Sequence, residues 1–261
     1  MKRASFLAVL AVLLFALALP AQSSATEAAH GSSNILTITT YDTGNEGHLI
    51  AFPDSTTMSI DCADGTITAK SHFHSDHCAD CGEGDYNRNI VAPGQFLYNK
   101  DGVTVQVVAA NARVIGEDAV YVDCPASDEN RESMGLWVKY RGFDYLTAGD
   151  LTASVEDSLG SALAERGVNV DVLKVSHHGS SSSSRLSYLL KILPEYAVIA
   201  GNASAPTDET FTNFTSAGVQ TIYYAYDYPL GAGYPVYRAN GDVVITTDGY
   251  TYTFSGGNPP F

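Results

Sequence analysis

Short segments in which apolar and polar residues alternate fill the first half of the chain from residue 35 onward. This period of two, together with many Val, Ile, Thr and Tyr residues, predicts β-strands. Gly, Asn, Asp and Pro residues between the segments predict turns. The predicted strands are residues 35–41, 48–52, 57–60, 67–70, 103–108, 119–122, 135–140 and 143–147.

The second half of the chain alternates between helical and extended patterns. Residues 154–166 carry apolar Val155, Leu159 and Leu163 at every fourth position, which predicts a helix that ends at Gly167. Further helices are predicted at 186–193 and 209–216, with strands at 170–175, 196–200 and 219–224 and a hairpin at 243–247 and 250–254. Strands first and then alternating helices and strands predict an α/β protein, a four-layer αββα sandwich of two sheets with helices outside.

The N-terminus has the pattern of a secretory signal peptide. Lys2 and Arg3 precede an apolar run over residues 4–19, and small residues follow up to Ala25. Cleavage near Ala25 would remove residues 1–25 and deliver a secreted or periplasmic protein. An uncleaved membrane anchor is the alternative, although the run is shorter than the ~20 residues that a spanning helix needs. The mature chain has no other segment of that kind.

The length and net charge of the mature chain indicate one acidic domain. Residues 26–34 predict a polar, disordered lead-in, and residues 35–261 are long enough for one domain with a sizeable core. Removal of residues 1–25 takes away only Lys2 and Arg3, so the net charge moves from −15 to −17. Such a surface repels polyanions at long range, which argues against a large nucleic-acid-binding face.

Four cysteines occur, at positions 62, 78, 81 and 124. In an exported protein an even number of cysteines predicts disulfides, and four cysteines allow three pairings. The spacing of Cys78 and Cys81 is also found in zinc and redox sites. A zinc role is less favoured here, because Cys62 and Cys124 stand alone and form no second pair of that spacing.

The strongest chemical signal lies directly after the strand predicted at 67–70. His72, His74, Asp76 and His77 fall within six positions, in the sequence HFHSDH. Imidazole nitrogens and carboxylate oxygens are ligands of zinc and similar ions. In an extended segment His72 and His74 project to the same side, and the following turn can direct Asp76 and His77 to a neighbouring position. The segment therefore predicts a site for two metal ions, with a solvated histidine-rich loop as the alternative.

Several motifs resemble those of a known superfamily. The HFHSDH segment matches the H-x-H-x-D-H signature of the metallo-β-lactamase superfamily. Residues 143–150 (FDYLTAGD) resemble its strand followed by Gly-Asp, and residues 42–61 resemble its opening hairpin with the first-motif aspartate. Residues 171–180 (DVLKVSHHGS) resemble a segment of ComEC-type DNA-uptake proteins, and phosphorylcholine esterases look similar in the same places. The resemblance covers residues 35–254 in matching order and implies the metallo-β-lactamase fold.

The resemblance also implies a role for each site residue. His72 and His74 would bind one ion, Asp76 and His77 the second, and Asp150 would bridge the two. His177 is the favoured last ligand of the second site, with His178 beside it to bind substrate or stabilise charge; the reverse assignment stays open. Asp61 would orient a ligand histidine, and Asn130 stands where many members have a third histidine. One or two Zn²⁺ ions are expected, and Mn²⁺ also suits such ligands.

The implied activity is hydrolysis by a metal-bound hydroxide, with Asp76 handling a proton as well as binding metal. A phosphodiester or related phosphate ester is favoured as substrate, a small-molecule substrate is also open, and a β-lactam is less favoured. The alternative is a secreted, non-catalytic metal- or substrate-binding module on the same fold. Two departures motivate it: Gly47-His48 replaces the family's opening Gly-Asp, and residues 202–207 lack a late histidine.

Overall fold

The computed structural model describes residues 34–201, 205–225, 234–239 and 241–256. Three predicted features lie wholly or partly outside these residues: the signal peptide, the lead-in up to residue 33, and residues 202–204 of the 202–207 segment that lacks a late histidine. In the described part of the chain, no helix combines the length and the apolar character needed to cross a bilayer.

The strands of the described residues form two sheets. The first is seven-stranded, in the order β16-β15-β1-β2-β3-β4-β5. It is antiparallel from β16 to β3, and β3, β4 and β5 run parallel. Its strands are β1 (Leu36–Thr40), β2 (Gly47–Ala51), β3 (Thr57–Asp61), β4 (Ile67–Lys70), β5 (Tyr86–Asn87), β15 (Val243–Thr247) and β16 (Tyr252–Ser255).

The second sheet is nine-stranded, in the order β14-β13-β12-β11-β10-β9-β7-β6, with β8 paired to β7. Strands β10 to β14 run parallel, and the others pair antiparallel. Its strands are β6 (Phe96–Lys100), β7 (Val103–Ala110), β8 (Arg113–Val114), β9 (Gly135–Tyr140), β10 (Phe143–Thr147), β11 (Val172–Lys174), β12 (Tyr196–Ile199), β13 (Thr221–Tyr224) and β14 (Val236–Arg238).

The main core lies between the two sheets. Ile38 and Ile50 of the first sheet and Val105, Val138 and Tyr145 of the second belong to one buried cluster. Side chains alternate between the faces of a strand, so the neighbours of these residues point away from this core. The alternation in the sequence therefore fixes which face of each sheet is buried against the other.

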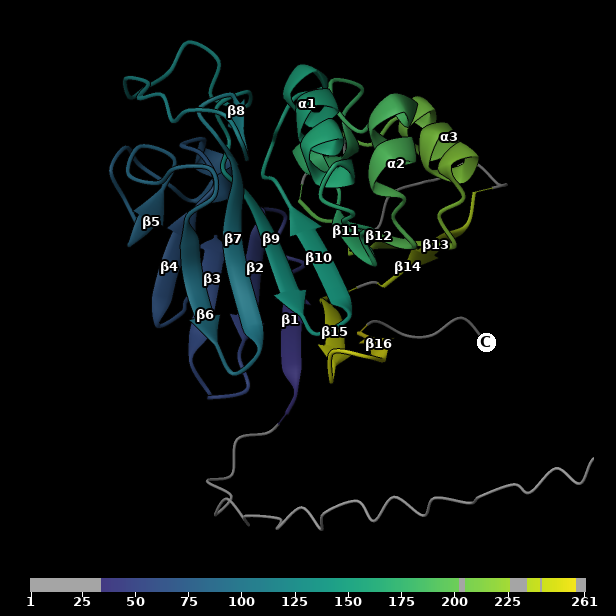
Figure 1. Cartoon of the computed structure of the whole chain (residues 1–261). Coiled ribbons are helices and arrows are strands. Elements are labelled where there is room, and N and C mark those ends of the chain that lie inside the picture. Colours follow the sequence, from purple (N-terminus) through teal and green to yellow (C-terminus); the bar gives the residue numbers. More distant parts are fainter. Residues whose placement is uncertain (1–33, 202–204, 226–233, 240, 257–261) are drawn as a thin grey trace, which may run out of the picture. The chain divides into compact units, whose positions relative to one another are not determined.

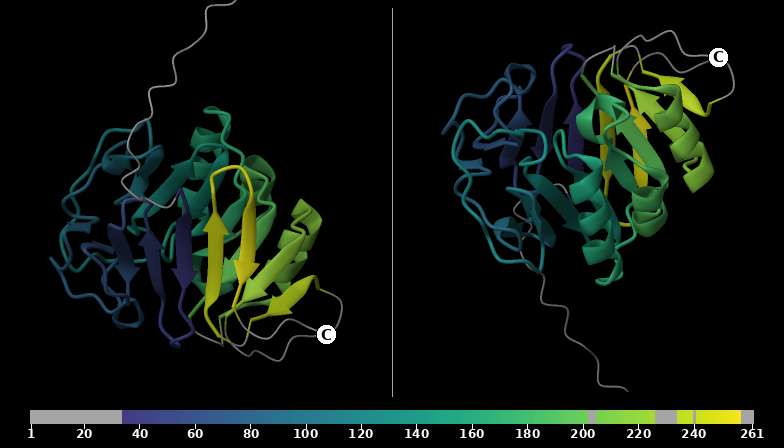
Figure 2. Two further views of the ribbon diagram at one scale, coloured as in Figure 1. Left: turned by 90° about the horizontal axis from the view of Figure 1, so that it is seen from below. Right: turned by 90° about the horizontal axis from the view of Figure 1, so that it is seen from above.

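The outer face of the nine-stranded sheet is covered by helices (Figure 1). Leu146 and Leu173 of the sheet pack there against Leu159, Tyr188 and Phe211. The helices of the described residues are α1 (Ala153–Ala164), α2 (Leu186–Ile192) and α3 (Asp208–Ala217), with short 3₁₀ turns at Ser75–His77 and Ser176–Gly179. Figure 2 shows all three α-helices on this one side of the sandwich.

The predicted α/β sandwich of two sheets is confirmed, with differences in detail: among the described residues, the three α-helices cover the nine-stranded sheet only. The strand predicted at 119–122 is wrong: these residues form an exposed loop with no strand beside it, and Tyr121 is 68% exposed. Strand β6 was not predicted because its sequence mixes polar and apolar residues. The sequence Asp101-Gly102 is typical of a tight β-hairpin turn, and it joins β6 to β7 with both residues at positive φ.

Helix α1 buries a carboxyl group that gives the fold a pH dependence. Burial raises the pKa of Glu156 to about 8, and the hydrogen bond from Ser184 opposes this only in part. The folded state therefore holds a proton that the unfolded chain releases, and stability falls as pH rises from about 5 to about 8. In chelator-treated protein, Glu156→Gln should flatten the plot of unfolding free energy against pH, whereas Asp157→Asn should leave it unchanged. An equal slope in wild type and Glu156→Gln would contradict the assignment.

Candidate metal centre

Four segments from both sheets meet at one edge of the sandwich. They are the turn before β2, the loop after β4, and the loops after β10 and β11. Because β10 and β11 are parallel neighbours, their carboxyl ends open at the same edge. These segments bring together Glu46, His72, His74, Asp76, His77, Asp150, His177 and His178.

Asp61, at the end of β3, organises the loop that follows β4. Its Oδ1 accepts a hydrogen bond from the Ser71 backbone N–H at 2.7 Å, and its Oδ2 lies 2.8 Å from Nδ1 of His77. A carboxylate only accepts hydrogen bonds, so Nδ1 of His77 carries the proton and Nε2 is directed to the site. Asp61 thus holds both the Ser71 backbone and the His77 ring.

The turn after β10 requires a glycine. Gly149 has a φ of +51°, and a Cβ at this position would lie 2.6 Å from Oγ of Ser71. This close approach brings Asp150 next to the histidines: its Oδ1 is 3.2 Å from Nε2 of His77, and its Oδ2 is 3.7 Å from Nε2 of His72. The two oxygens of Asp150 therefore face two different histidines.

His72 and His74 form the first group with Asp150. Nε2 of His72 lies 3.2 Å from Nδ1 of His74, and Nδ1 of His72 lies 3.0 Å from Oγ of Ser71. The ligand atoms of His72, His74 and Asp150 all lie within 4.8 Å of one another. His72 is fully buried, whereas His74 is exposed, so this group opens to solvent.

His178 belongs to the second group. Its Nδ1 lies 2.9 Å from the Ala200 carbonyl oxygen, and its Nε2 lies 3.5 Å from Oδ2 of Asp76 and 3.6 Å from Oδ1 of Asp150. Gly201 makes room for this ring, because a Cβ there would stand 2.2 Å from Nδ1 of His178. The ring is therefore held from behind and presents Nε2 to the carboxylates.

His177 lies on the other side of Asp150. Its Nε2 is 3.7 Å from Oδ2 of Asp150, the same oxygen that faces His72, and 3.4 Å from Nδ2 of Asn130. His177 and His178 thus face different oxygens of Asp150. The order of these two residues in the chain did not indicate which oxygen each one faces, because their positions depend on the left-handed backbone conformation of both.

The donor atoms fit a divalent cation. Nε2 of His77 and of His178, Oδ1 of Asp150 and Oε1 of Glu46 are buried and have no hydrogen-bond partner in the described structure. The four residues form one group in which a ligand atom of each lies within 4.8 Å of those of the others. Buried polar atoms are rarely left without partners, and such atoms gathered at one point are what a metal ion satisfies.

Glu46 and Lys174 are the residues that the sequence reasoning missed. Both are fully buried, and Nζ of Lys174 donates to Oε2 of Glu46. Glu46 Oε2 also lies 3.4 Å from Nδ1 of His178, and Oε1 lies 3.5 Å from Nε2 of His48. The only local signal was an acidic residue next to Gly47, one position before the place where the family has its Gly-Asp.

The carboxylates at the centre are ionised, as a cation requires. Burial raises the pKa of Asp150, but the neighbouring His77 outweighs it and holds this pKa well below its usual range. His178, whose Nε2 lies 3.5 Å from Oδ2, lowers the pKa of Asp76 to about 2. Burial lowers the pKa of His77 and His178, but the carboxylates around them outweigh it and raise both, so protons compete with an ion for these two rings. Burial lowers the pKa of His72 to about 4. Ionised carboxylates and a neutral imidazole are the forms that bind metal.

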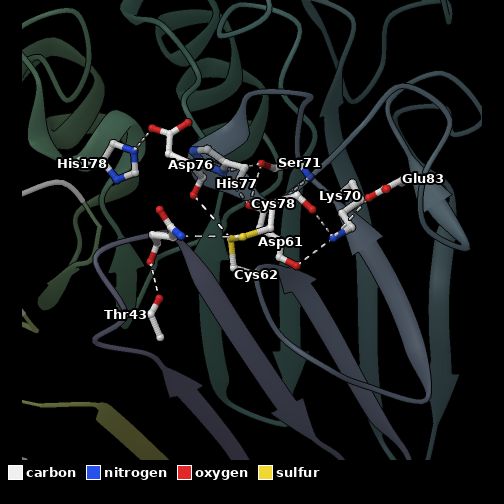
Figure 3. Close-up of a disulfide and its surroundings, with 11 residues drawn as sticks. Thr43, Asp61, Cys62, Lys70, Ser71, Asp76, His77, Cys78, Glu83 and His178 are labelled. Carbon is white, nitrogen blue, oxygen red and sulfur yellow. Dashed lines mark hydrogen bonds and ion pairs between the residues drawn. A yellow bond between two sulfur atoms is a disulfide. The ribbon is translucent and has the colours of Figure 1, made fainter.

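Two disulfides hold the loop that carries these ligands. The Cys62–Cys78 bond joins the residue after Asp61 to the residue after His77 (Figure 3). The second bond, Cys81–Cys124, ties the same loop to the segment that precedes Asn130. The prediction of disulfides is confirmed, and the two cysteines of the C-x-x-C spacing bond to different partners.

Comparison with known proteins gives partial matches. No protein-family model matches the chain. The ComE operon protein 3 of Bacillus subtilis is 30% identical over 101 residues, which is 39% of this chain. The chain covers only 12% of the length of that protein.

Solved structures that match the chain in part share little sequence with it. The metallo-β-lactamase fold protein YhfI from Bacillus subtilis has a TM-score of 0.48 and 11% identity, over 74% of this chain and 98% of that one. A Parabacteroides distasonis protein described as a metal-dependent hydrolase has a TM-score of 0.47 and 13% identity, over 72% of this chain and 92% of that one. In sequence, the chain thus resembles a ComE-type protein over a partial match of 101 residues.

Proposed function

We propose that the protein is a metal-dependent hydrolase that acts on phosphodiesters or related phosphate esters. The observation that carries this proposal is the convergence of unpartnered, buried nitrogen and oxygen atoms of His77, His178, Asp150 and Glu46 at one point. A second group of ligands shares Asp150, which supports two neighbouring ion sites. Two cations side by side suit a reaction in which charge develops on several phosphate oxygens.

Each ion would have its own set of ligands. His72, His74 and Asp150 would hold one, with His177 at the same Asp150 oxygen as His72. Asp76, His77, Asp150 and His178 would hold the other, with Glu46 in the same group. A bound divalent ion supplies Lewis acidity and lowers the pKa of a coordinated water to about 7. Zinc suits these ligands, and manganese also accepts histidine and carboxylate.

The residues of the chain would handle the proton and the substrate charge. The side chain of Asp76 is 41% exposed, so its carboxylate can accept a hydrogen bond from a water at the centre. Its low pKa makes it a weak base, so accepting a proton would depend on the acidity that a bound ion gives to that water. Its Oδ2 faces Nε2 of His178 at 3.5 Å, which keeps the carboxylate directed at the centre. Asn130 lies beside His177 with an amide that can donate to a substrate oxygen.

We further propose that the protein is exported, with residues 1–25 as the signal peptide. The two disulfides support an oxidising compartment, since such bonds persist in secreted and periplasmic proteins. The net charge of −17 after removal of residues 1–25 supports a small substrate over a long polyanion, because the surface repels nucleic acid at long range.

A non-catalytic binding module on the same fold is the second candidate. It is favoured by the Glu46–Lys174 ion pair, which places a buried ammonium group beside the second set of ligands. Such a cation reduces the negative charge available to a metal ion, so the second ion could be weak or absent. The two candidates differ in turnover and agree in binding at least one ion.

Hydrolysis of bis(p-nitrophenyl) phosphate by purified protein tests the proposal. We expect turnover that chelation abolishes and added zinc or manganese restores, with nitrocefin, a β-lactam, left intact. His74→Ala should lower the rate about 100-fold or more, because it removes a ligand. Ser75→Ala is the matched control: Ser75 is exposed in the same loop and should keep the wild-type rate. Bound metal without any turnover of phosphodiesters would favour the binding module.

A further inference from the structure

The loop that carries both late histidines has an unusual backbone. His177, His178 and Gly179 follow one another with φ values of 49°, 52° and 84°. The left-handed region is costly for residues with a Cβ, and two such residues in succession persist only where their surroundings fix them. The structure must therefore contain groups that hold this turn.

The serine run after the turn supplies some of these groups. Oγ of Ser182 lies 2.6 Å from Nδ1 of His177, on the ring edge opposite the site. Oγ of Ser183 donates to the backbone carbonyl of Ser176 at 2.9 Å, which closes the loop on itself. Ser183 and Ser184 are buried, so the run is part of the interior. Low sequence complexity here reflects hydrogen bonding, not a flexible linker.

The segment from Gly149 to the first turns of α1 binds the same loop at three places. The Gly149 carbonyl accepts from the His177 N–H at 3.0 Å, and the Ala153 N–H donates to the Ser182 carbonyl at 2.8 Å. Oε2 of Glu156 accepts from the Ser184 N–H at 2.6 Å. The same segment contains Asp150. One segment thus carries the central carboxylate and holds the loop of His177 and His178.

We propose that Glu156 and Ser182 are positioning residues that fix His177 and His178 relative to Asp150. Glu156 anchors the far end of the loop, and Ser182 sets the orientation of the His177 ring. The inference rests on the proposed metal-dependent function, because its consequence is the affinity of the centre for an ion. It gives a reason for a fully buried carboxyl in α1, which a stability role alone leaves unexplained.

Zinc affinity, measured by competition with a chromophoric chelator, tests the proposal. Partners that orient metal ligands typically change metal affinity 10- to 100-fold, so Ser182→Ala should weaken zinc binding about 10-fold or more. Ser181→Ala is the matched control within the same run: Ser181 is exposed, and its side chain has no partner among the described residues. We expect this control to bind zinc like the wild type.

The role of Glu156 is tested by two substitutions, with zinc affinity measured in the same way. Glu156→Ala should weaken zinc binding about 10-fold or more, and Glu156→Gln should restore it to within about 3-fold, because the amide oxygen still accepts from Ser184. Asp157→Ala is the control on the same helix, since its carboxylate faces Ser187 and Lys191. The rise in Tm on adding zinc, compared with the Tm of the metal-free protein, separates positioning from a general loss of stability.

The outcomes distinguish the two proposals. Wild-type protein that binds no zinc or manganese would overturn the metal-dependent function and this inference with it. Wild-type binding with Ser182→Ala and Glu156→Ala both within 2-fold of it would overturn the positioning role alone. If Glu156→Ala does not fold, Ser182→Ala decides, together with the ring ¹⁵N shifts of His177 in the metal-free protein. Those shifts should change in Ser182→Ala and stay unchanged in Ser181→Ala.

Discussion

Asp150→Asn protein is expected to lose about 1,000-fold or more in phosphodiester hydrolysis and at least one bound ion, while its fold is retained. Both oxygens of Asp150 take part in the centre: Oδ1 faces His77 and His178, and Oδ2 faces His72. The amide replaces one carboxylate oxygen by a donor and removes the negative charge that holds cations. Residues that only hydrogen-bond to a metal ligand typically change metal affinity or activity 10- to 100-fold when mutated, and loss of a ligand shared by two ions should have a larger effect.

The fold of this variant should survive, because the substitution keeps the shape of the side chain and changes one charge at the edge of the sandwich. A modest loss of metal-free stability is expected, since the pKa of Asp150 is held below its usual range and its ionised form therefore stabilises the metal-free fold. Elemental analysis, hydrolysis rates and chelator-treated unfolding curves provide the measurements. Asp144→Asn is the control from the preceding strand, where the carboxylate binds Trp137 and Lys139. Full metal content and a near wild-type rate in Asp150→Asn would remove Asp150 from the centre.

The second large effect is expected at the buried ion pair. Lys174→Met should lower the free energy of unfolding by about 3–5 kcal/mol, because it leaves Glu46 buried without its cation. Burial raises the pKa of Glu46, and the charges of Lys174 and His77 outweigh that effect and keep it well below its usual range. The double variant Glu46→Gln with Lys174→Met should recover most of the loss, because no uncompensated charge then remains.

Urea unfolding of the chelator-treated proteins measures this effect. Lys139→Met is the control: Lys139 pairs with Asp144, its side chain is 43% exposed, and its loss should cost less than about 1 kcal/mol. A Lys174→Met protein as stable as the control would show that the carboxyl of Glu46 is protonated or hydrated in the folded chain. No recovery in the double variant would instead point to Lys174 packing as the source of the loss.

Local patterns carried most of what could be predicted about the centre. His72, His74, Asp76 and His77 lie in one short loop, so their spacing alone indicated a shared site. Glu46 had no such pattern. Its partner Lys174 lies 128 residues further along the chain, and only the fold brings them together. A contact of that separation leaves no periodic signal in one sequence.

The same reasoning applies to the fold and the cysteines. Alternation predicted the central strands because one face of each is buried, whereas the loop at 119–122 has β-branched residues but no neighbouring strand to pair with. The pairing of Cys62 with Cys78 and of Cys81 with Cys124 was one of three that the sequence left open. The pairing is decided by which loops the fold brings together, and residue types alone do not indicate it.

Both disulfides end on the loop that supplies His77, and this affects the entropy of assembling the centre. The bonds close segments with sequence separations of 16 and 43 residues. In the chain-entropy account they disfavour the unfolded chain by about 3 and about 4 kcal/mol. The ordering of this loop is therefore supplied by covalent bonds, unlike that of small zinc modules that fold only around their metal. Ions can then enter and leave a loop that is already shaped, so metal exchange need not involve unfolding.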